Sequence, residues 1–362
     1  MFYYYIIFSV AIILSYFCVS LAKYIGHKYD ILLYPQADRW HSRPIAIHGG
    51  LGFFPVLVLL IIFTTSMYSP LNSLMLDENI YDSVINKIFG DLSFLIGLIG
   101  STLILFVFGW LDDILKFRAR SKLLVQIIVS SIFIFDFGTF QLTDIEFLNF
   151  LYTLFWFVGI INATNLIDCM DGLCAGVLVI VSIFLGVILV INQPNSEQYF
   201  FSINLLVLFA GVLIGFLILN FPPAKIFMGD AGSLPLGFII AALTLPTEFN
   251  TFANNQNMMQ QVLIPIALLS YPIMDTTLVV ITRVLNKKKF YIGGKDHSCH
   301  RLVNLGLSDK QSILICYLYT FIGGLTALLI EIFPESFSIF FLLLLILSIV
   351  SVIYLFRLEQ NT

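Results

Sequence analysis

The stretch Leu103-Ile-Leu-Phe-Val-Phe-Gly-Trp-Leu-Asp112-Asp113 is an apolar run that ends abruptly on two adjacent carboxylates. Such a run is typical of a membrane-spanning helix, and the acidic pair then marks the point where the chain emerges into water. Adjacent carboxylates repel each other unless a cation lies near them. Lys116, one helical turn after Asp112, or Mg²⁺ with a phosphate group would supply that charge. The segment therefore indicates a metal-assisted site at the membrane surface, with an ordinary solvated helix end as the alternative.

The rest of the chain is equally apolar. Of its 362 residues, 59% are hydrophobic and 11% are charged, with a mean hydropathy of +0.97, whereas soluble domains have about 45–50% and about 25%. Eleven apolar stretches are candidate spans, near residues 3–22, 49–65, 92–109, 122–138, 148–163, 173–191, 200–220, 232–246, 261–284, 314–332 and 337–356. The stretches near 148–163 and 232–246 are short, so ten is the alternative count. The sequence predicts one all-α polytopic integral membrane domain over residues 1–362.

The basic residues determine the predicted orientation of this domain. With the N-terminus outside, all of the 18 lysines and arginines except Lys87 fall on the internal side or at its boundary, in agreement with the positive-inside rule. The first span lacks a basic leader and a small-residue cleavage site, so we expect it to be retained rather than removed as a signal peptide. The acidic segments then share the cytoplasmic face.

A second polar segment, Asn162-Ala-Thr-Asn165-Leu-Ile-Asp168-Cys-Met-Asp171-Gly172, lies between two apolar runs and contains no cation. On a helix, residues three apart lie on one face, which would align Asn165, Asp168 and Asp171. Three oxygen-bearing groups on one face suit a hard cation or a sugar. A purely structural role is disfavoured, because two unpaired carboxylates at a membrane border are costly to bury. Gly172 suits a sharp exit from the helix or close packing.

A third segment, Met228-Gly229-Asp230-Ala231-Gly232-Ser233, interrupts two apolar runs with small residues. Gly229 and Gly232 allow the backbone to approach a ligand closely, and Asp230 near a helix start would be an accessible oxygen ligand for a metal. A plain tight turn is the alternative. The segment is not a P-loop, because the Gly-Lys-Ser/Thr ending is absent.

The fourth segment, Asp296-His297-Ser298-Cys299-His300-Arg301, follows a run of lysines. His297, His300 and Arg301 can donate hydrogen bonds to phosphate oxygens, and arginine can do so with two nitrogens at once. Cys299 between two histidines raises the alternative of a zinc site. Structural zinc requires four nitrogen or sulfur ligands at recognisable spacing, and no CxxC motif accompanies this segment. We therefore expect phosphate binding here and no zinc site.

Taken together, these segments resemble the polyprenyl-phosphate N-acetylhexosamine-1-phosphate transferase family, over nearly the whole chain and in order. The resemblance is carried by His41-Ser-Arg43-Pro44 with Gly49-Gly50, Asp112-Asp113 with Lys122-Leu-Leu-Val-Gln126, Asn162-Ala-Thr-Asn165-Leu-Ile-Asp168 with Asp171-Gly172, Phe227-Met228-Gly229-Asp230 with Gly232-Ser233, Pro272-Ile-Met-Asp275, and Asp296-His297 with His300-Arg301-Leu302. Membership would imply transfer of a sugar 1-phosphate from a UDP-N-acetylhexosamine to undecaprenyl phosphate, with release of UMP, in the bacterial inner membrane. Nucleic acid is not an expected partner, and the sequence leaves a homodimer open.

The resemblance also implies roles for individual residues. Asp230 and Asn165 match the positions at the Mg²⁺ ion, for which Mn²⁺ is the alternative. Asp112 matches the residue that handles the proton of the lipid phosphate, and Asp113 and Asp168 match other essential acidic positions. The predicted phosphate- and substrate-binding residues are Lys116, Arg120, Lys122, Asn162, Asp171, His297, His300 and Arg301.

Departures from the family pattern bear on the sugar and the pathway. Residues 297–300 read His-Ser-Cys-His where the muramoyl-pentapeptide branch has three successive histidines, which argues against a peptidoglycan precursor as substrate. The resemblance favours the branch that initiates a cell-envelope polysaccharide such as O-antigen, with UDP-GlcNAc as the commonest donor. UDP-GalNAc, a 6-deoxy N-acetylhexosamine and UDP-MurNAc-pentapeptide are the alternative donors. The loop Pro44-Ile-Ala-Ile-His48 departs from the usual Pro-x-Pro pattern.

Two other classes of membrane protein also use acidic residues. Ion-coupled transporters place their acids near the midplane and are commonly built from repeats, but here only Asp136 and Asp275 lie inside predicted spans and no repeat is detected. Intramembrane prenyltransferases use Asp-rich Mg²⁺ motifs with a different spacing. The transferase interpretation is the better supported one, and the transporter is the alternative.

Overall fold

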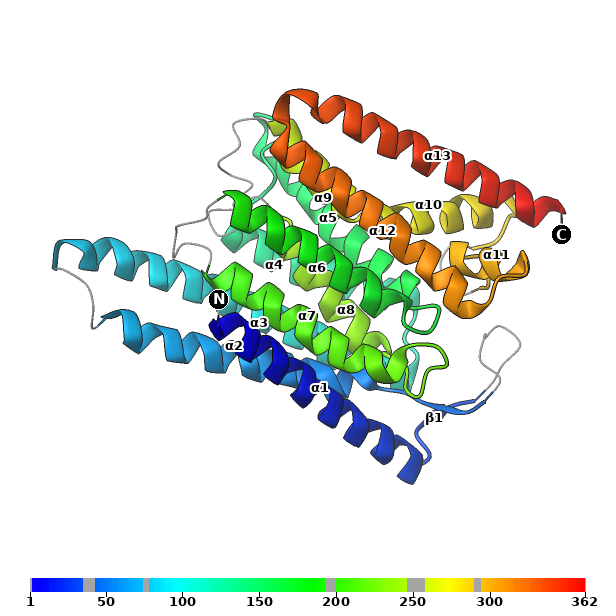
Figure 1. The fold of residues 1–362 in the computed structure, drawn as a ribbon, viewed down its shortest axis with the longest axis horizontal. Helices are drawn as coiled ribbons and strands as arrows, with labels where there is room; N and C mark the ends of the chain where they lie inside the picture. The colour runs from blue at the N-terminus through cyan, green and yellow to red at the C-terminus, as the bar shows by residue number, and fades with distance from the viewer. Residues whose placement is uncertain are drawn as a thin grey trace.

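The computed structural model describes residues 2–34, 43–73, 78–192, 200–245, 258–289 and 294–361, so His41 of the predicted motif set lies outside the described residues. The first elements are α1 (Phe2–Lys28), β1 (Leu32–Leu33), β2 (Ile45–Ala46), α2 (Gly49–Ser73), α3 (Glu78–Leu115), α4 (Ala119–Phe137), α5 (Glu146–Ile167), α6 (Leu173–Asn192) and α7 (Phe200–Asn220). The remaining ones are α8 (Asp230–Leu243), α9 (Met258–Leu268), α10 (Ser270–Leu285), α11 (Ser298–Asn304), α12 (Asp309–Ile332), the 3₁₀ turn η3 (Pro334–Ser336) and α13 (Phe337–Asn361). The fold is a bundle of long helices (Figure 1).

The predicted all-α polytopic membrane architecture is confirmed. Within the described part of the chain, eight helices are long and apolar enough to cross a membrane, namely α1, α2, α3, α5, α6, α7, α12 and α13. The pair α9 and α10 would make a ninth span, bent by 73° at the break between its halves. The protein is therefore a multi-pass membrane protein.

The predicted count of ten or eleven spans exceeds this number for two reasons. The predicted span near 232–246 is α8, which has only 14 residues, or about 21 Å at 1.5 Å per residue, against a hydrocarbon core of about 30 Å. The predicted span near 122–138 is α4, which carries Arg120 and Lys122 in its first turn and Asp136 near its end. The stretch near 148–163, the other short one, belongs to α5, a full span of 22 residues.

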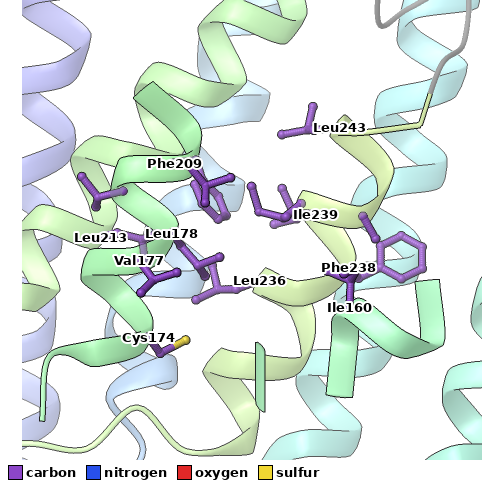
Figure 2. Packing of buried hydrophobic residues seen from close by; sticks show 14 of the residues in the cluster. Ile160, Cys174, Val177, Leu178, Phe209, Leu213, Leu236, Phe238, Ile239 and Leu243 are labelled. Atoms are coloured by element: carbon purple, nitrogen blue, oxygen red, sulfur yellow. The ribbon is translucent and has the colours of Figure 1, made fainter. Parts of the chain in front are cut away.

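Helix α8 lies in the middle of the bundle, and this explains why so short a helix is apolar on every side. All of its residues from Ala231 to Leu243 are buried. Leu236 of α8 lies beside Leu178 of α6, Ile239 faces Phe209 of α7, and Phe238 lies beside Ile160 of α5 (Figure 2). A helix that is apolar all round is stabilised by contact with neighbours on all sides. The neighbours of α8 therefore fix the position of its first residue, Asp230.

Glycines bring the flanking helices very close to the start of α8. A Cβ atom on Gly109 of α3 would lie 2.3 Å from the Asp230 carbonyl oxygen, and one on Gly50 of α2 would lie 2.5 Å from the Gly232 nitrogen. Small residues at helix contacts allow backbones in membranes to approach in this way. The ends of α2, α3 and α8 consequently meet at one place.

A small ribbon holds the loop that precedes α8. Strands β1 and β2 pair antiparallel, and Ala46 of β2 also bridges to Ile226. The Phe227 N–H donates to the Ala46 carbonyl at 2.9 Å, and the Gly49 N–H donates back to the Phe227 carbonyl at 2.7 Å. These bonds connect the start of α2 to the loop that ends at Asp230. In Figure 1 the ribbon and α11 lie toward the same side of the molecule.

We predict that Gly109→Ala destabilises the protein, because the added methyl group would overlap backbone atoms of α8 that cannot move aside. The expected cost is about 1–3 kcal/mol, as for other overpacked positions, and thermal unfolding in detergent would measure it. Gly100→Ala is the matched control, because a Cβ atom on Gly100 of the same helix meets nothing within 4 Å. Equal melting temperatures for the two variants would contradict the close contact.

Candidate active site

Lys122 joins two carboxylates that come from different helices. Its Nζ atom lies 2.5 Å from Oδ2 of Asp112, at the end of α3, and donates to Oδ2 of Asp230, at the start of α8, at 2.7 Å. Asp112 also accepts a hydrogen bond from the Phe117 N–H at 2.9 Å, and its side chain is almost fully buried. The basic side chain beside Asp112 is therefore Lys122, and the prediction that Lys116 would take this place is wrong. Lys116 is exposed and follows the end of α3 with a positive φ of 54°, which turns the chain out of the helix.

Asn165 holds the other side of the Asp230 carboxylate. The Asn165 amide nitrogen donates to Oδ1 of Asp230 at 2.9 Å and to the hydroxyl of Ser233 at 2.8 Å. Because these bonds use the nitrogen, the amide oxygen of Asn165 is the atom that a hard cation would contact. The two residues predicted at the metal, Asp230 and Asn165, are thus in direct contact.

Asp113 caps the N-terminus of α8. Its Oδ1 accepts from the Asp230 N–H at 3.1 Å, and its Oδ2 accepts from the Ala231 N–H at 3.3 Å. A carboxylate at this position satisfies backbone donors that a helix start leaves open. His48 Nδ1 lies 3.4 Å from the same carboxylate, and Gly229, with φ of 75°, leaves the space that Asp113 occupies. Asp113 therefore positions Asp230, and a catalytic role of its own stays a prediction.

The expectation that Asn165, Asp168 and Asp171 share one helical face is wrong. Helix α5 ends one residue before Asp168, and the chain then turns through Gly172, whose φ is 75°. The Asp171 side chain accepts a hydrogen bond from the Ala224 N–H at 2.8 Å and so joins this turn to the loop before α8. A sharp turn at Gly172 is present, but α5 has already ended at Ile167, and this earlier end separates Asp171 from Asn165.

The charges of this cluster are suited to a divalent cation. Burial raises the pKa of Asp168 well above its usual value, and the nearby carboxylates of Asp230 and Asp113 raise it further. Among the described residues, Lys122 bridges Asp112 and Asp230, and His48 lies beside Asp113. The donors are carboxylate and amide oxygens, the ligands that Mg²⁺ prefers. The donor set of Asp230, Asn165 and Asp168 therefore fits Mg²⁺ chemically.

Three predicted substrate-binding residues lie around this acidic cluster without contacting it. The side chain of Asn162 donates to the Gln126 oxygen at 2.6 Å and to the Val158 carbonyl at 2.7 Å, which ties α5 to α4. Lys116 and Arg120 are exposed beside it. Asn162 therefore stabilises the contact between α4 and α5. Phosphate binding by Lys116 and Arg120 stays a prediction.

The histidines of the fourth segment lie on and before α11. His297 Nδ1 lies 2.8 Å from Oδ2 of Asp275 in α10, and the Ser298 N–H donates to Oδ1 of the same carboxylate at 2.7 Å. Both histidine side chains are buried. Burial, together with the charge of His297, lowers the pKa of His300 to about 4, so its ring is neutral at pH 7. His300 can therefore bind a phosphate oxygen through an N–H but not through a positive charge.

Arg301 is committed to contacts within the protein. Its guanidinium donates to the Thr282 hydroxyl of α10 at 2.7 Å and to the Leu355 carbonyl of α13 at 2.8 Å, and its Nε donates to the Asp296 carbonyl at 2.9 Å. Arg283 separately holds the Asp296 carboxylate with two bonds of 2.7 Å. These contacts favour a structural role for Arg301, and phosphate binding by it stays a prediction.

Sequence reasoning did not connect three groups that the structure brings together. Asp275 and His297 form a buried pair, which could have been suspected because an acid inside an apolar span needs a partner. His48 lies beside Asp113. Cys169 and Cys299 place their sulfur atoms 3.6 Å apart, although 130 positions separate them in the sequence, and no local pattern signals this contact.

Comparison with known proteins agrees with this arrangement. The profile of glycosyl transferase family 4 matches residues 95–248, which include the acidic cluster from Asp112 to Asp230. A probable undecaprenyl-phosphate N-acetylglucosaminyl 1-phosphate transferase of Bacillus subtilis (strain 168) is 37% identical over 253 residues, covering 67% of this chain and 68% of the relative. The chain belongs to glycosyl transferase family 4. The predicted family membership is thereby confirmed.

Other relatives extend over different lengths of the chain. A decaprenyl-phosphate N-acetylglucosaminephosphotransferase of Mycobacterium leprae is 27% identical over 331 residues, covering 85% of this transferase and 79% of the relative. A phospho-N-acetylmuramoyl-pentapeptide-transferase of Streptococcus agalactiae is 34% identical over 174 residues, covering 43% of this transferase and 50% of the relative. The relatives named for N-acetylglucosamine thus align over more of the chain than the muramoyl-pentapeptide relative does.

We predict that the pair of His297 and Asp275 stabilises the transferase most at low pH. Burial lowers the pKa of His297, but the Asp275 carboxylate more than offsets this and leaves the pKa above its ordinary value. A raised folded-state pKa gives a contribution that is complete below the unfolded value of about 6.5 and disappears as the pH passes the folded value. Melting curves of the unmodified protein and His297→Gln should therefore converge as the pH rises above the unfolded value of about 6.5 and through the folded value.

His27→Gln, at the exposed end of α1, is the control for the loss of a histidine elsewhere. A stability difference for His297→Gln that grows with pH would have the wrong sign for an ion pair.

Proposed function

We propose that this protein transfers N-acetylglucosamine 1-phosphate from UDP-GlcNAc to undecaprenyl phosphate and releases UMP. The observation that carries the proposal is the cluster of Asp112, Asp230 and Asn165 around Lys122, which lies where α3, α4, α5 and α8 meet. The donor set suits a cation bound to pyrophosphate, and the fold surrounding it belongs in a membrane. The active site would face the cytoplasm of the bacterial inner membrane, where the positive-inside rule places these helix ends.

An apolar groove beside the cluster supports a lipid acceptor. The groove runs along α3 and α4 and is lined by Leu103, Ile104, Val107, Phe108, Leu111 and Val125. Leu111 directly precedes Asp112, and Val125 lies one helical turn after Lys122. Several of its side chains are exposed at positions that would face lipid. A polyprenyl chain in this groove would bring its phosphate group to Asp112 and Lys122.

The residues of the cluster suggest how the acceptor is positioned. Asp230, Asn165 and Asp168 would hold Mg²⁺, which when bound neutralises charge on the donor pyrophosphate. Lys122 is partly exposed and would contact the acceptor phosphate, which releases Asp112 to orient that phosphate. A lipid phosphate with a second pKa near about 6 is largely dianionic at pH 7, so it needs no strong base to act as a nucleophile.

We favour direct attack of the lipid phosphate on the β-phosphorus of the donor. The rival is a two-step route in which an aspartate first becomes phosphorylated. The buried position of Asp112, and its bond to Lys122, suit orientation of an incoming phosphate better than attack on a separate donor.

The sugar and the pathway rest on the relatives and on residues 297–300. The names of the Bacillus subtilis and Mycobacterium leprae relatives specify N-acetylglucosamine. The His-Ser-Cys-His sequence departs from the histidine triplet of the muramoyl-pentapeptide branch. The product would be the first lipid-linked sugar of a cell-envelope polysaccharide such as O-antigen. UDP-GalNAc and a 6-deoxy N-acetylhexosamine are the alternative donors.

We expect protein purified in detergent to release UMP from UDP-GlcNAc when undecaprenyl phosphate and Mg²⁺ are present, with the sugar recovered in the organic phase. Asp230→Ala should lose nearly all of this activity, because it removes a metal ligand and the partner of both Lys122 and Asn165. Removing Mg²⁺ with a chelator should have the same effect, and Mn²⁺ should restore part of the rate.

The same assay with other UDP-sugars as donors separates an error in the sugar from an error in the reaction. Product with another UDP-N-acetylhexosamine alone would keep the reaction and change the sugar. No product with any UDP-sugar would reject the transferase function and favour the alternative, an ion-coupled transporter.

Asp112→Asn should reduce kcat by about 10²-fold or more, within the range of positioned acid–base groups, because the amide cannot orient a phosphate together with Lys122. The measurement is the initial rate of UMP release at saturating donor. Asp136→Asn, at the far end of α4, is a control for neutralising an acid elsewhere. Near-normal turnover of Asp112→Asn would exclude both orientation of the acceptor and a phosphorylated Asp112.

A further inference from the structure

Cys169, Cys299 and His300 form a second group of potential metal ligands, built from softer atoms than the acidic cluster. Cys169 lies in the turn between α5 and α6, and the other two lie on α11. The two sulfur atoms are 3.6 Å apart, and the ligand atoms of all three side chains lie within 4.8 Å of one another. The structure thus brings together two thiols and one imidazole from segments that are remote in sequence.

We propose that Cys169, Cys299 and His300 bind a soft divalent cation of the Zn²⁺ class, with a water molecule as the fourth ligand. Three protein ligands and one open position are a common arrangement for zinc. Thiolate and imidazole ligands select Zn²⁺ over Mg²⁺, whereas the carboxylates and amide around Asp230 do the opposite. The protein would therefore separate the two metals by ligand chemistry.

The distance between the sulfur atoms is appropriate for zinc. Two sulfurs at about 2.3 Å from one tetrahedral ion are about 3.8 Å apart, close to the observed 3.6 Å. A disulfide bond would require about 2.05 Å instead. A nitrogen at about 2.0 Å from the same ion would lie about 3.5 Å from each sulfur. His300 therefore has to approach by at most about 1.3 Å, which a rotation of its side chain can provide.

The surroundings allow such an ion to be buried. Two thiolates balance the charge of a divalent cation, so the complex with a neutral imidazole carries no net charge to desolvate. Cys299 and His300 are buried, whereas Cys169 is half-buried and so partly accessible. Burial raises the pKa of both thiols, so binding has to release their protons.

The sequence alone argues against zinc because too few ligands lie close together in it, whereas the fold supplies a further ligand from a remote segment. In the sequence, Cys299 has only His297 and His300 as neighbouring ligands, and no second cysteine accompanies them. In the structure, His297 contacts Asp275 through Nδ1, and Cys169 arrives from another segment. The proposed site depends on these contacts and not on transferase activity.

The test is a titration of the reduced, detergent-purified protein with Cd²⁺ alone, followed by the ultraviolet charge-transfer absorbance of cadmium thiolate. We expect one equivalent to bind and Zn²⁺ to displace it. Cys169→Ser and Cys299→Ser should each weaken binding by at least about tenfold, since even residues that only support metal ligands have effects of this size. His300→Ala should weaken binding while leaving the thiolate absorbance per bound ion unchanged.

Two cysteines serve as matched controls. Cys18→Ser replaces a half-buried thiol of α1, and Cys174→Ser replaces a buried thiol of α6. Both should bind Cd²⁺ as the unmodified protein does, and melting temperatures identify any variant that fails to fold.

No thiolate absorbance in the reduced protein, or binding that persists in both Cys169→Ser and Cys299→Ser, would overturn the proposal. A Cys169–Cys299 disulfide that persists in the purified protein without added oxidant, detected as a mass loss of two hydrogens, would also overturn it. None of these readouts uses a UDP-sugar, so failure of the proposed transferase reaction would leave this result intact.

Discussion

The ion pairs of Lys122 with Asp112 and Asp230 are the interaction on which the rest of the site depends. Carboxylates at the border of a membrane are costly to bury unless a cation compensates them. The lysine of α4 compensates one acid from α3 and one from α8. The end of α3 and the starts of α4 and α8 therefore meet at the Lys122 ammonium group, and these ion pairs fix the three helix ends relative to one another. Removal of the lysine would leave two acids that repel each other in the same place.

Close backbone packing gives this charge cluster its rigidity. Helix α8 is buried on every side, and glycines of α2 and α3 let their backbones contact its first turn. Asp113 then uses both of its oxygens to cap that turn. Apolar packing therefore places Asp230, and hydrogen bonds orient it. The site combines a fixed framework of helix ends with side chains such as Lys122 that have room to move.

The sequence was sufficient to predict the membrane fold, because long apolar runs report burial in lipid directly, and the run ending at Asp112 and Asp113 also located the site. It was less informative about contacts across the bundle. Lys116 is closer in sequence to Asp112, but Lys122 makes the contact, because the chain leaves α3 in a left-handed turn at Lys116. The helical spacing of Asn165, Asp168 and Asp171 was misleading, because α5 already ends at Ile167. The meeting of Cys169 and Cys299 depends on tertiary packing alone.

Helix α13 illustrates why burial is a poor guide to importance in this bundle. Only 11% of its spanning window is buried, so it resembles a peripheral helix with little influence on the interior. Nevertheless its Leu355 carbonyl accepts a hydrogen bond from the guanidinium of Arg301 on α11. A change in bilayer thickness that tilts α13 would pull on this bond and shift the segment that carries His297 and His300. This bond therefore links the most lipid-exposed of the described spans to the segment that carries the two buried histidines.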